Sequence, residues 1–206
     1  MNKNMHIAFF SKELPSDRPN GVSCQVHRLA NALFKMGHSI TCFSFSPKPA
    51  DSCYEVVQLR HACQSKMMKK IEAGIVFKKM MHQRFDLYHF HGDDYLIAGC
   101  KRRVRTFYGS AFYETLHARS VSRFTYQALF YCFELISSLR TGKKVAISAM
   151  TKAVLPRITS IIPCGVPLDR FKPASTKTTH PSLLFRETYR AANRGIFSYG
   201  SLQSIR

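Results

Sequence analysis

Short apolar segments alternate with segments of helical periodicity along most of this chain. Such βαβ alternation implies a parallel sheet with helices on both faces, which is a Rossmann-like α/β fold. The predicted strands, which are short and rich in β-branched or aromatic residues, are residues 6–10, 39–45, 85–90, 104–107, 144–147 and 160–162. The predicted helices are residues 22–36, 66–83, 93–100, 121–139 and 149–155. Residues 50–63 show no clear pattern, although 54–59 fit a further strand.

Length and proline density define the expected domains. The chain has 206 residues, 45% of them hydrophobic, which is enough for one well-packed domain with little left for a second. From Pro163 to Pro181 the chain has four prolines and few periodic apolar residues, and residues 182–185 then fit a new strand. We therefore expect a domain at residues 1–165, a connector at 166–181 and the start of a second domain at 182–206.

A large basic excess narrows the range of partners. Lys and Arg number 31 against 12 Asp and Glu, a formal charge of +19, which attracts polyanions. The densest basic runs are residues 66–79 and residues 101–105. Nucleic acid is the weaker interpretation, because the chain lacks RNP aromatics, a KH-type GXXG loop and a zinc finger.

An anionic membrane surface is the other interpretation of the charge. The predicted helix at 66–83 brings apolar side chains near one another, flanked by five lysines, as in helices that lie on anionic bilayers. These apolar residues are Met67, Met68, Ile71, Ile75 and Met81. The alternative is a helix that faces the core, with lysines that are merely solvated.

Cysteine usage and hydropathy predict a cytoplasmic protein, peripheral on the inner face of the membrane if the helix binds there. The seven cysteines are odd in number and form no CxxC pair, which indicates reduced thiols and neither a disulfide frame nor a zinc site. The apolar run at 124–139 is interrupted by Gln127 and Glu134 and is too short to span a bilayer. The apolar N-terminal run is too short for a signal peptide.

Ligands of parallel sheets bind at the carboxyl ends of the strands, so the loops there are the candidate site. After the first strand, Gly21 begins a helix, where backbone amides and the helix dipole favour an anion. The alternative is an ordinary turn with Asn20 or Ser23 as the helix N-cap.

Two histidines mark the end of the strand at 85–90. His89 and His91 face the same side of a strand, and His91 falls at its end, where an imidazole acts as a base or as a hydrogen-bond donor to a substrate hydroxyl. The alternative is that both rings are partly buried and satisfied by the backbone. A metal site would need Asp93 or Asp94 as a third ligand, and we expect none, because no Cys or further His is nearby.

Two further strand ends carry candidates. Tyr108 and Gly109 form a turn that opens a helix, with Glu114 following. Ser148 follows the strand at 144–147, where its alternative role is the N-cap of the next helix.

Several stretches together resemble the acceptor-binding domain of family 4 glycosyltransferases, which have the two-domain GT-B architecture. In chain order these stretches are IAFFSKELP…GVS, LANALFKMGHSITCFSF, DLYHFHGDD, RTFYGSAFYE, VAIS and IPCGVPLDRFKP. The last is the most specific, and the resemblance covers about residues 5–173.

The resemblance implies a retaining, metal-independent hexosyltransferase that needs no cofactor beyond its nucleotide-sugar co-substrate. Such enzymes transfer a sugar to a hydroxyl of an acceptor, which is a glycan or is lipid-linked. Gly21, with Val22 beside it, maps near the donor phosphates, and His91 maps beside the acceptor in an orienting role. The remaining cleft positions are His89, Tyr108, Gly109, Glu114 and Ser148.

The chain also departs from the family pattern. Tyr108-Gly109 replaces a frequent His-Gly, Pro167 replaces the usual Asp, and Glu187 stands where glycine is common. The basic residue and paired glutamates of the donor-binding domain have no counterpart before Arg206. We therefore expect a chain truncated in its second domain and inactive alone. The alternative is a non-catalytic subunit that partners a separate donor-binding chain.

Overall fold

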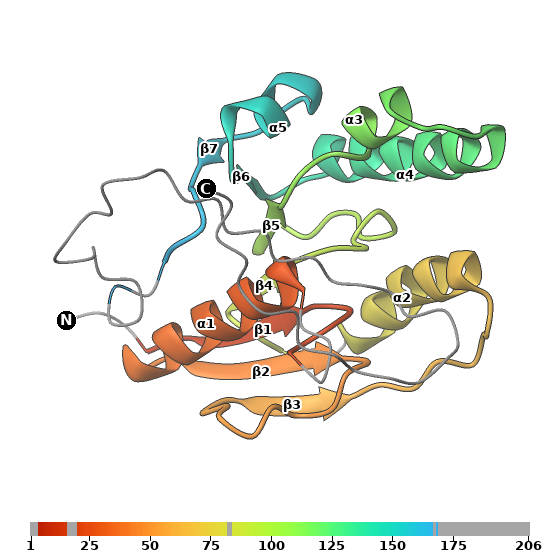
Figure 1. Ribbon diagram of the computed structural model, residues 1–206. Helices are drawn as coiled ribbons and strands as arrows, with labels where there is room; N and C mark the ends of the chain where they lie inside the picture. The colour runs from red at the N-terminus through yellow and green to blue at the C-terminus, as the bar shows by residue number, and fades with distance from the viewer. Residues whose placement is uncertain (1–3, 16–19, 82–83, 167, 169–206) are drawn as a thin grey trace, which may run out of the picture. The chain divides into compact units, whose positions relative to one another are not determined.

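A seven-stranded parallel sheet forms the centre of the protein (Figure 1). The computed structural model describes residues 4–15, 20–81, 84–166 and 168. The strand order is β3-β2-β1-β4-β5-β6-β7, and every neighbouring pair is parallel. The strands are β1 His6–Phe10, β2 Ser39–Ser44, β3 Glu55–Gln58, β4 Leu87–Phe90, β5 Arg103–Phe107, β6 Lys143–Ala146 and β7 Ser160–Ile161. The helices are α1 Gly21–Lys35, α2 Lys66–Met80, α3 Ala111–Leu116, α4 Val121–Leu139 and α5 Ala149–Val154. The predicted parallel α/β fold is therefore confirmed, with β3 as the strand that fits residues 54–59.

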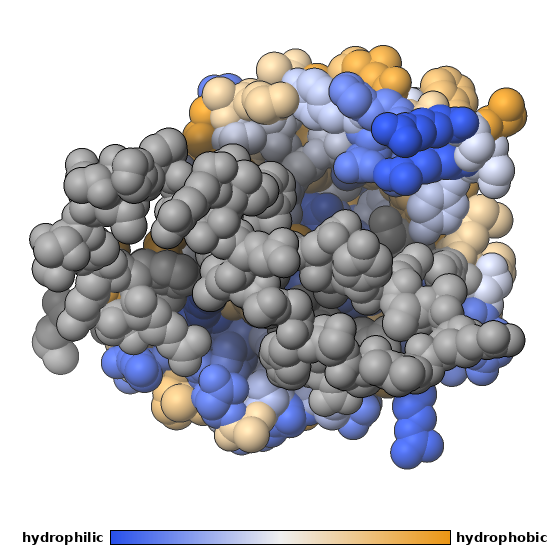
Figure 2. Space-filling view, in the orientation of Figure 1, coloured by the Kyte–Doolittle hydropathy of each residue, from blue (hydrophilic) through white to orange (hydrophobic). Residues whose placement is uncertain are grey.

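Helices α3 and α4 lie after β5 and keep apolar side chains at the surface. Phe112 of α3 packs against Tyr131 of α4, with ring centroids 5.2 Å apart. Leu116, Val121 and Phe124, around the turn between the two helices, are exposed. Figure 2 shows hydrophobic residues over these helices beside strongly hydrophilic ones. The surface formed by α3 and α4 thus has apolar and charged side chains next to one another.

The two faces of the sheet are covered by different helices, because successive strand residues point to opposite sides. Phe9 of β1 packs in one buried cluster with Val26 of α1. Its neighbour Phe10 packs in another with Phe77 of α2. The prediction of helices on both faces is confirmed.

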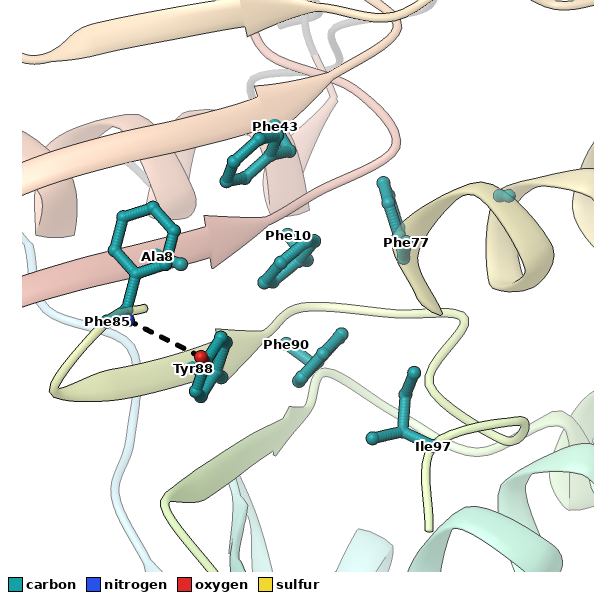
Figure 3. Close-up of a cluster of buried hydrophobic side chains, with 9 residues drawn as sticks. Ala8, Phe10, Phe43, Phe77, Phe85, Tyr88, Phe90 and Ile97 are labelled. Carbon is teal, nitrogen blue, oxygen red and sulfur yellow. Dashed lines mark hydrogen bonds between the residues drawn. The ribbon is translucent and has the colours of Figure 1, made fainter. Parts of the chain in front are cut away.

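Aromatic rings fill the core beneath α2 (Figure 3). Phe10 stacks between Phe43 and Phe90, with ring centroids 5.0 and 4.5 Å away. Phe77 meets Phe10 edge-on at 5.3 Å. Stacked and edge-on pairs of this kind contribute about 0.5–1.5 kcal/mol each beyond the area they bury. The three stacked rings come from β1, β2 and β4, so they fix the central strands side by side.

One predicted helix is wrong: residues 93–100 form turns. Asp93 has a φ of 55° and Gly99 a φ of 72°, and both values are incompatible with a right-handed helix. Tertiary contacts hold this segment: Tyr95 stacks on Phe133 of α4, with ring centroids 4.3 Å apart, and Asp94 is buried. The local apolar pattern that predicted a helix reflects packing against α4.

The predicted strand at 182–185 and the predicted second domain at 182–206 lie outside the described residues, as does most of the expected connector at 166–181. Residues 1–165 form one compact unit. No helix within the described residues is long and apolar enough to cross a membrane.

Candidate active site

A cavity at the carboxyl ends of the strands, the larger of the two described below, lies where the strand order reverses. The chain runs outward from β1 through β2 and β3 and then returns to β4, on the other side of β1. Ligands of open parallel sheets bind at the carboxyl ends of the strands beside such a reversal. A cavity of about 600 Å³ lies there, lined by residues that follow β1, β4 and β5, among them Ser11, His91 and Tyr108.

Five of the site residues expected from the sequence line this larger cavity: Gly21, Val22, His91, Tyr108 and Gly109. They come from segments that are far apart along the chain, which meet because the carboxyl ends of β1, β4 and β5 share one edge of the sheet. The cavity is therefore lined by the loops after residues 10, 90 and 107.

Glu114 and Ser148 line a second cavity, of about 470 Å³. Tyr108 and Gly109 line both cavities. The Ser148 hydroxyl accepts a hydrogen bond from the Thr151 amide at 3.3 Å and is the N-cap of α5. The N-cap role of Ser148 is thus confirmed, and this residue does not share a cavity with His91.

His91 is buried and uncharged at neutral pH. Burial, followed by the charges of His89 and Arg105, lowers the pKa of His91 well below the usual 6.5. Its Nδ1 atom lies 2.9 Å from the Tyr108 hydroxyl. Burial raises the pKa of Tyr108, so the phenol keeps its proton. When that hydroxyl donates to Nδ1, the imidazole proton is on Nε2, an atom with no hydrogen-bond partner among the described residues.

His89 lies behind His91 and lines neither cavity. Its Nε2 atom is 2.8 Å from the Thr106 hydroxyl, and its ring centroid is 4.1 Å from that of His91. Burial, followed by the charge of Arg105, lowers the pKa of His89 to about 3. His89 is thus a buried ring, as in the alternative interpretation of the sequence, but its hydrogen-bond partner is the Thr106 side chain and not the backbone.

The start of α1 presents two backbone amides to the cavity edge. Asn20 is the N-cap: its side-chain oxygen accepts from the Ser23 amide at 2.8 Å, and the Ser23 hydroxyl accepts from the Asn20 amide at 3.1 Å. Among the described residues, no hydrogen bond uses the amides of Gly21 and Val22. A Cβ added to Gly21 would meet no atom within 4 Å. This helix end has both room and unused donors for an anionic group.

A buried ionic cluster at the cavity was not anticipated from the sequence. Asp94 lies 3.2 Å from Arg103 and 3.6 Å from Arg105, and it accepts a short hydrogen bond from Ser137. All four residues are buried. The basic run at 101–105 is therefore only partly a surface charge, because Arg103 and Arg105 are buried. The sequence feature that could have indicated this cluster is the alternation of Arg103 and Arg105 with Val104. In a strand, this alternation places both arginine side chains on one face.

Glu134 of α4 lines both cavities. Its carboxylate accepts from the Ser110 hydroxyl at 2.8 Å and from the Ala111 amide at 2.9 Å, at the start of α3. Sequence analysis treated Glu134 only as an interruption in an apolar run. Within residues 4–15, 20–81 and 84–166, no group of three His, Cys, Asp or Glu side chains is arranged to hold a metal ion.

Comparisons with known proteins agree with this architecture. Residues 19–170 match the profile of Glycosyltransferase Family 4. The structure is similar to the crystal structure of WaaG, a glycosyltransferase involved in lipopolysaccharide biosynthesis, with a TM-score of 0.55 and 14% sequence identity. The match covers 75% of this chain and 44% of WaaG, so the chain spans less than half the length of that structure. No curated protein sequence matches it. The family profile covers most of the chain, which therefore belongs to glycosyltransferase family 4 and has the Rossmann-like fold of one half of a GT-B enzyme.

Proposed function

We propose that the larger cavity, at the carboxyl ends of β1, β4 and β5, is the acceptor side of a glycosyltransferase cleft. The observation that carries this proposal is that Gly21, His91 and Tyr108 line one cavity at the reversal of strand order. The substrates would be a nucleotide sugar and the hydroxyl of a glycan or lipid-linked acceptor. The transferred group would be a hexosyl residue, with its anomeric configuration retained.

The start of α1 is proposed to receive the donor diphosphate. Charge builds up on the diphosphate as the sugar leaves, and fixed amide donors stabilise such charge without a metal ion. The unused amides of Gly21 and Val22 support this role. A donor-binding domain, either on this polypeptide or on a separate chain, would supply the opposite wall with its contacts to base and sugar.

His91 is proposed to orient the acceptor and not to remove its proton. A side chain with a strongly lowered pKa is a weak base, whereas its Nε2–H can donate to a sugar hydroxyl. The Tyr108 hydroxyl at 2.9 Å would select that tautomer. Both residues line the same cavity as Gly21, which supports a shared substrate.

Gly21→Ala tests the phosphate role. The added Cβ meets no protein atom within 4 Å, so the variant should fold normally while the methyl group blocks close approach of phosphate oxygens. We expect its affinity for UDP-glucose, UDP-N-acetylglucosamine or GDP-mannose, whichever binds the parent best, to fall about tenfold, which is about 1.4 kcal/mol. Calorimetric titration measures the affinity.

The matched control is Gly165→Ala, whose added Cβ also meets open space but which lines neither cavity. If the two variants bind equally well, the phosphate role is wrong. The same samples, assayed for released nucleoside diphosphate, should stay at background, since one wall cannot orient both substrates. Turnover that His91→Ala abolishes would show that this chain needs no second wall.

Helix α2 supports a second proposal, contact with an anionic membrane. It buries Ala73 and Phe77, while Met67, Met68 and Ile75 are each more than 40% exposed. The exposed apolar side chains lie on a helix that also carries several lysines. We expect vesicles containing phosphatidylglycerol to carry the protein upward in flotation, and neutral vesicles not to do so. Flotation unchanged by Lys69→Glu with Lys78→Glu would rule out this contact.

A further inference from the structure

Arg105 is a buried cation whose hydrogen-bond donors are unused. The residue is 8% exposed, and it makes no hydrogen bond with any described residue. Its single ion pair, with Asp94, is 3.6 Å long from Nε, beyond hydrogen-bond range. Burying a guanidinium whose N–H groups make no hydrogen bonds raises the free energy of the folded state unless another group accepts those hydrogen bonds.

The neighbouring Arg103 differs in this respect. Its Nη1 donates to the Ile97 carbonyl at 3.2 Å, and its Nη2 to the Ser137 carbonyl at 3.3 Å. Its Nη1 also lies 3.2 Å from Asp94, closer than any atom pair between Arg105 and that carboxylate. Asp94 is therefore engaged mainly by Arg103, which leaves Arg105 short of a counterion.

Asp94 is the acid in the ion pairs of both Arg103 and Arg105 among the described residues. Lys144 is also buried nearby, and its pKa is lowered first by burial and then by the charge of Arg103. The cluster thus holds three basic side chains against Asp94. Glu134, another acid of the cavity, is bound to the start of α3.

The Arg105 guanidinium faces the larger cavity. Arg105 lines that cavity, and its Nη1 lies 3.6 Å from the position of a Cβ on Gly92, the residue that follows His91. The guanidinium carbon lies 4.6 Å from the centre of the Phe107 ring, and this cation–π contact restricts the position of the guanidinium. The donors are therefore both fixed in place and adjacent to His91.

We propose that Arg105 binds an oxyanion on the acceptor, a phosphate, while His91 contacts the acceptor hydroxyl. A guanidinium presents paired N–H donors that match two oxygens of a phosphate, and low solvent access strengthens the contact. This inference rests on the proposed function, which it deepens by assigning the acceptor a negative charge. The donor diphosphate keeps its own place at the start of α1, so the two anions have separate donors in one cavity.

The test measures binding of inorganic phosphate to the whole chain and to Arg105→Gln. The parent is expected to bind saturably, and Arg105→Gln to bind about tenfold more weakly or worse, as for the loss of a charged hydrogen bond. Arg105→Lys keeps the positive charge but loses the paired N–H donors of the guanidinium, so its affinity for phosphate should lie between those of the parent and Arg105→Gln. The control is Arg102→Gln, which removes an exposed charge just before β5 and should bind like the parent.

Two soluble probes separate the sources of the phosphate. Glucose 6-phosphate represents a phosphorylated glycan, and dihexanoyl phosphatidic acid below its micelle concentration represents a lipid headgroup. Binding of either more tightly than inorganic phosphate, with loss in Arg105→Gln, supports the proposal and assigns the source. If the parent binds none of the three probes, the proposal fails whether or not the variant folds.

Nucleotide binding distinguishes this proposal from the function on which it rests. Affinity for uridine diphosphate should depend on Gly21→Ala and not on Arg105→Gln. If Arg105→Gln abolishes binding of uridine diphosphate and phosphate alike, Arg105 belongs to the donor and the acceptor assignment is overturned. If the nucleotide fails to bind but phosphate still requires Arg105, the anion site stands while the glycosyltransferase function loses its support.

Discussion

Replacing Asp94 with alanine will lower the free energy of unfolding by about 3–5 kcal/mol. Asp94 is 1% exposed and is the acid within ion-pair distance of both Arg103 and Arg105 among the described residues. Its removal leaves two buried guanidinium groups facing each other without a counter-charge. It also takes away the acceptor for the Ser137 hydroxyl. Urea unfolding followed by circular dichroism measures the loss.

The matched control for this change is Asp51→Ala. Asp51 also contacts a basic side chain, with its carboxylate 3.2 Å from His27 Nε2, but the Asp51 side chain is 80% exposed. Exposed pairs contribute about 1 kcal/mol or less, so this variant should stay close to the parent. Equal losses for the two variants would mean that solvent reaches the cluster, contrary to the burial described above.

The protein will lose stability as the pH falls from 7 toward 5. His89, with a pKa of about 3, and His91, with a pKa well below 6.5, are uncharged when folded, whereas in the unfolded chain they titrate near 6.5. Between these values the unfolded state binds more protons, so acid favours unfolding. The contribution is fully present above pH 6.5 and falls by about 1.4 kcal/mol per pH unit for each histidine below it. At pH 5 the loss from His89 is about 2 kcal/mol, and His91 adds to it in the same direction.

Denaturant titrations at pH 7.5, 6 and 5 measure this dependence. The double variant His89→Gln with His91→Gln should show a much flatter profile, because neither replacement takes up a proton. His117→Gln is the control, since His117 is an exposed histidine of the same domain. A double variant as acid-sensitive as the parent would assign the effect to other groups.

Much of the sheet could be predicted from the sequence because its signals are local. Residues 6–10 are a compact apolar run, residues 39–45 contain β-branched and aromatic residues, and the spacing of Val26 and Ala30 marks the buried face of α1. At one end of that helix Asn20 is the N-cap, one of the two candidates expected there, and just past the other end Gly37 has a φ of 92°, which glycine adopts readily. Each of these features depends on a few neighbouring residues.

The errors and omissions depend on contacts distant along the chain. Residues 93–100 have an apolar pattern that a helix would fit, yet Tyr95 is held by Phe133. The burial of Arg105 was not predicted, because its strand was not known to lie inside the sheet, between β4 and β6. The order of strands decides burial here, and short apolar runs do not encode that order.

Among the candidate site residues, too, those with a local sequence signal could be predicted and those that depend on distant contacts could not. Gly21, His91 and Tyr108 could be named because each follows a predicted strand. Glu114 and Ser148 were expected in the same cleft, but they lie in the second cavity, beyond the carboxylate of Glu134. Glu134 sits in mid-helix, and only the packing of α4 against α3 brings it to both cavities.

The two outer strands affect how copies of this domain behave in concentrated solution. β3 has four residues and β7 has two, so the free backbone donors and acceptors at each edge are few. Long bare edges are the usual template for intermolecular β-pairing and aggregation. Glu55, which begins β3, adds a charge to one of these edges and lies 3.9 Å from Lys48. Self-association of this domain would therefore proceed through side chains, such as the exposed apolar ones around the turn between α3 and α4, and not through extension of the sheet.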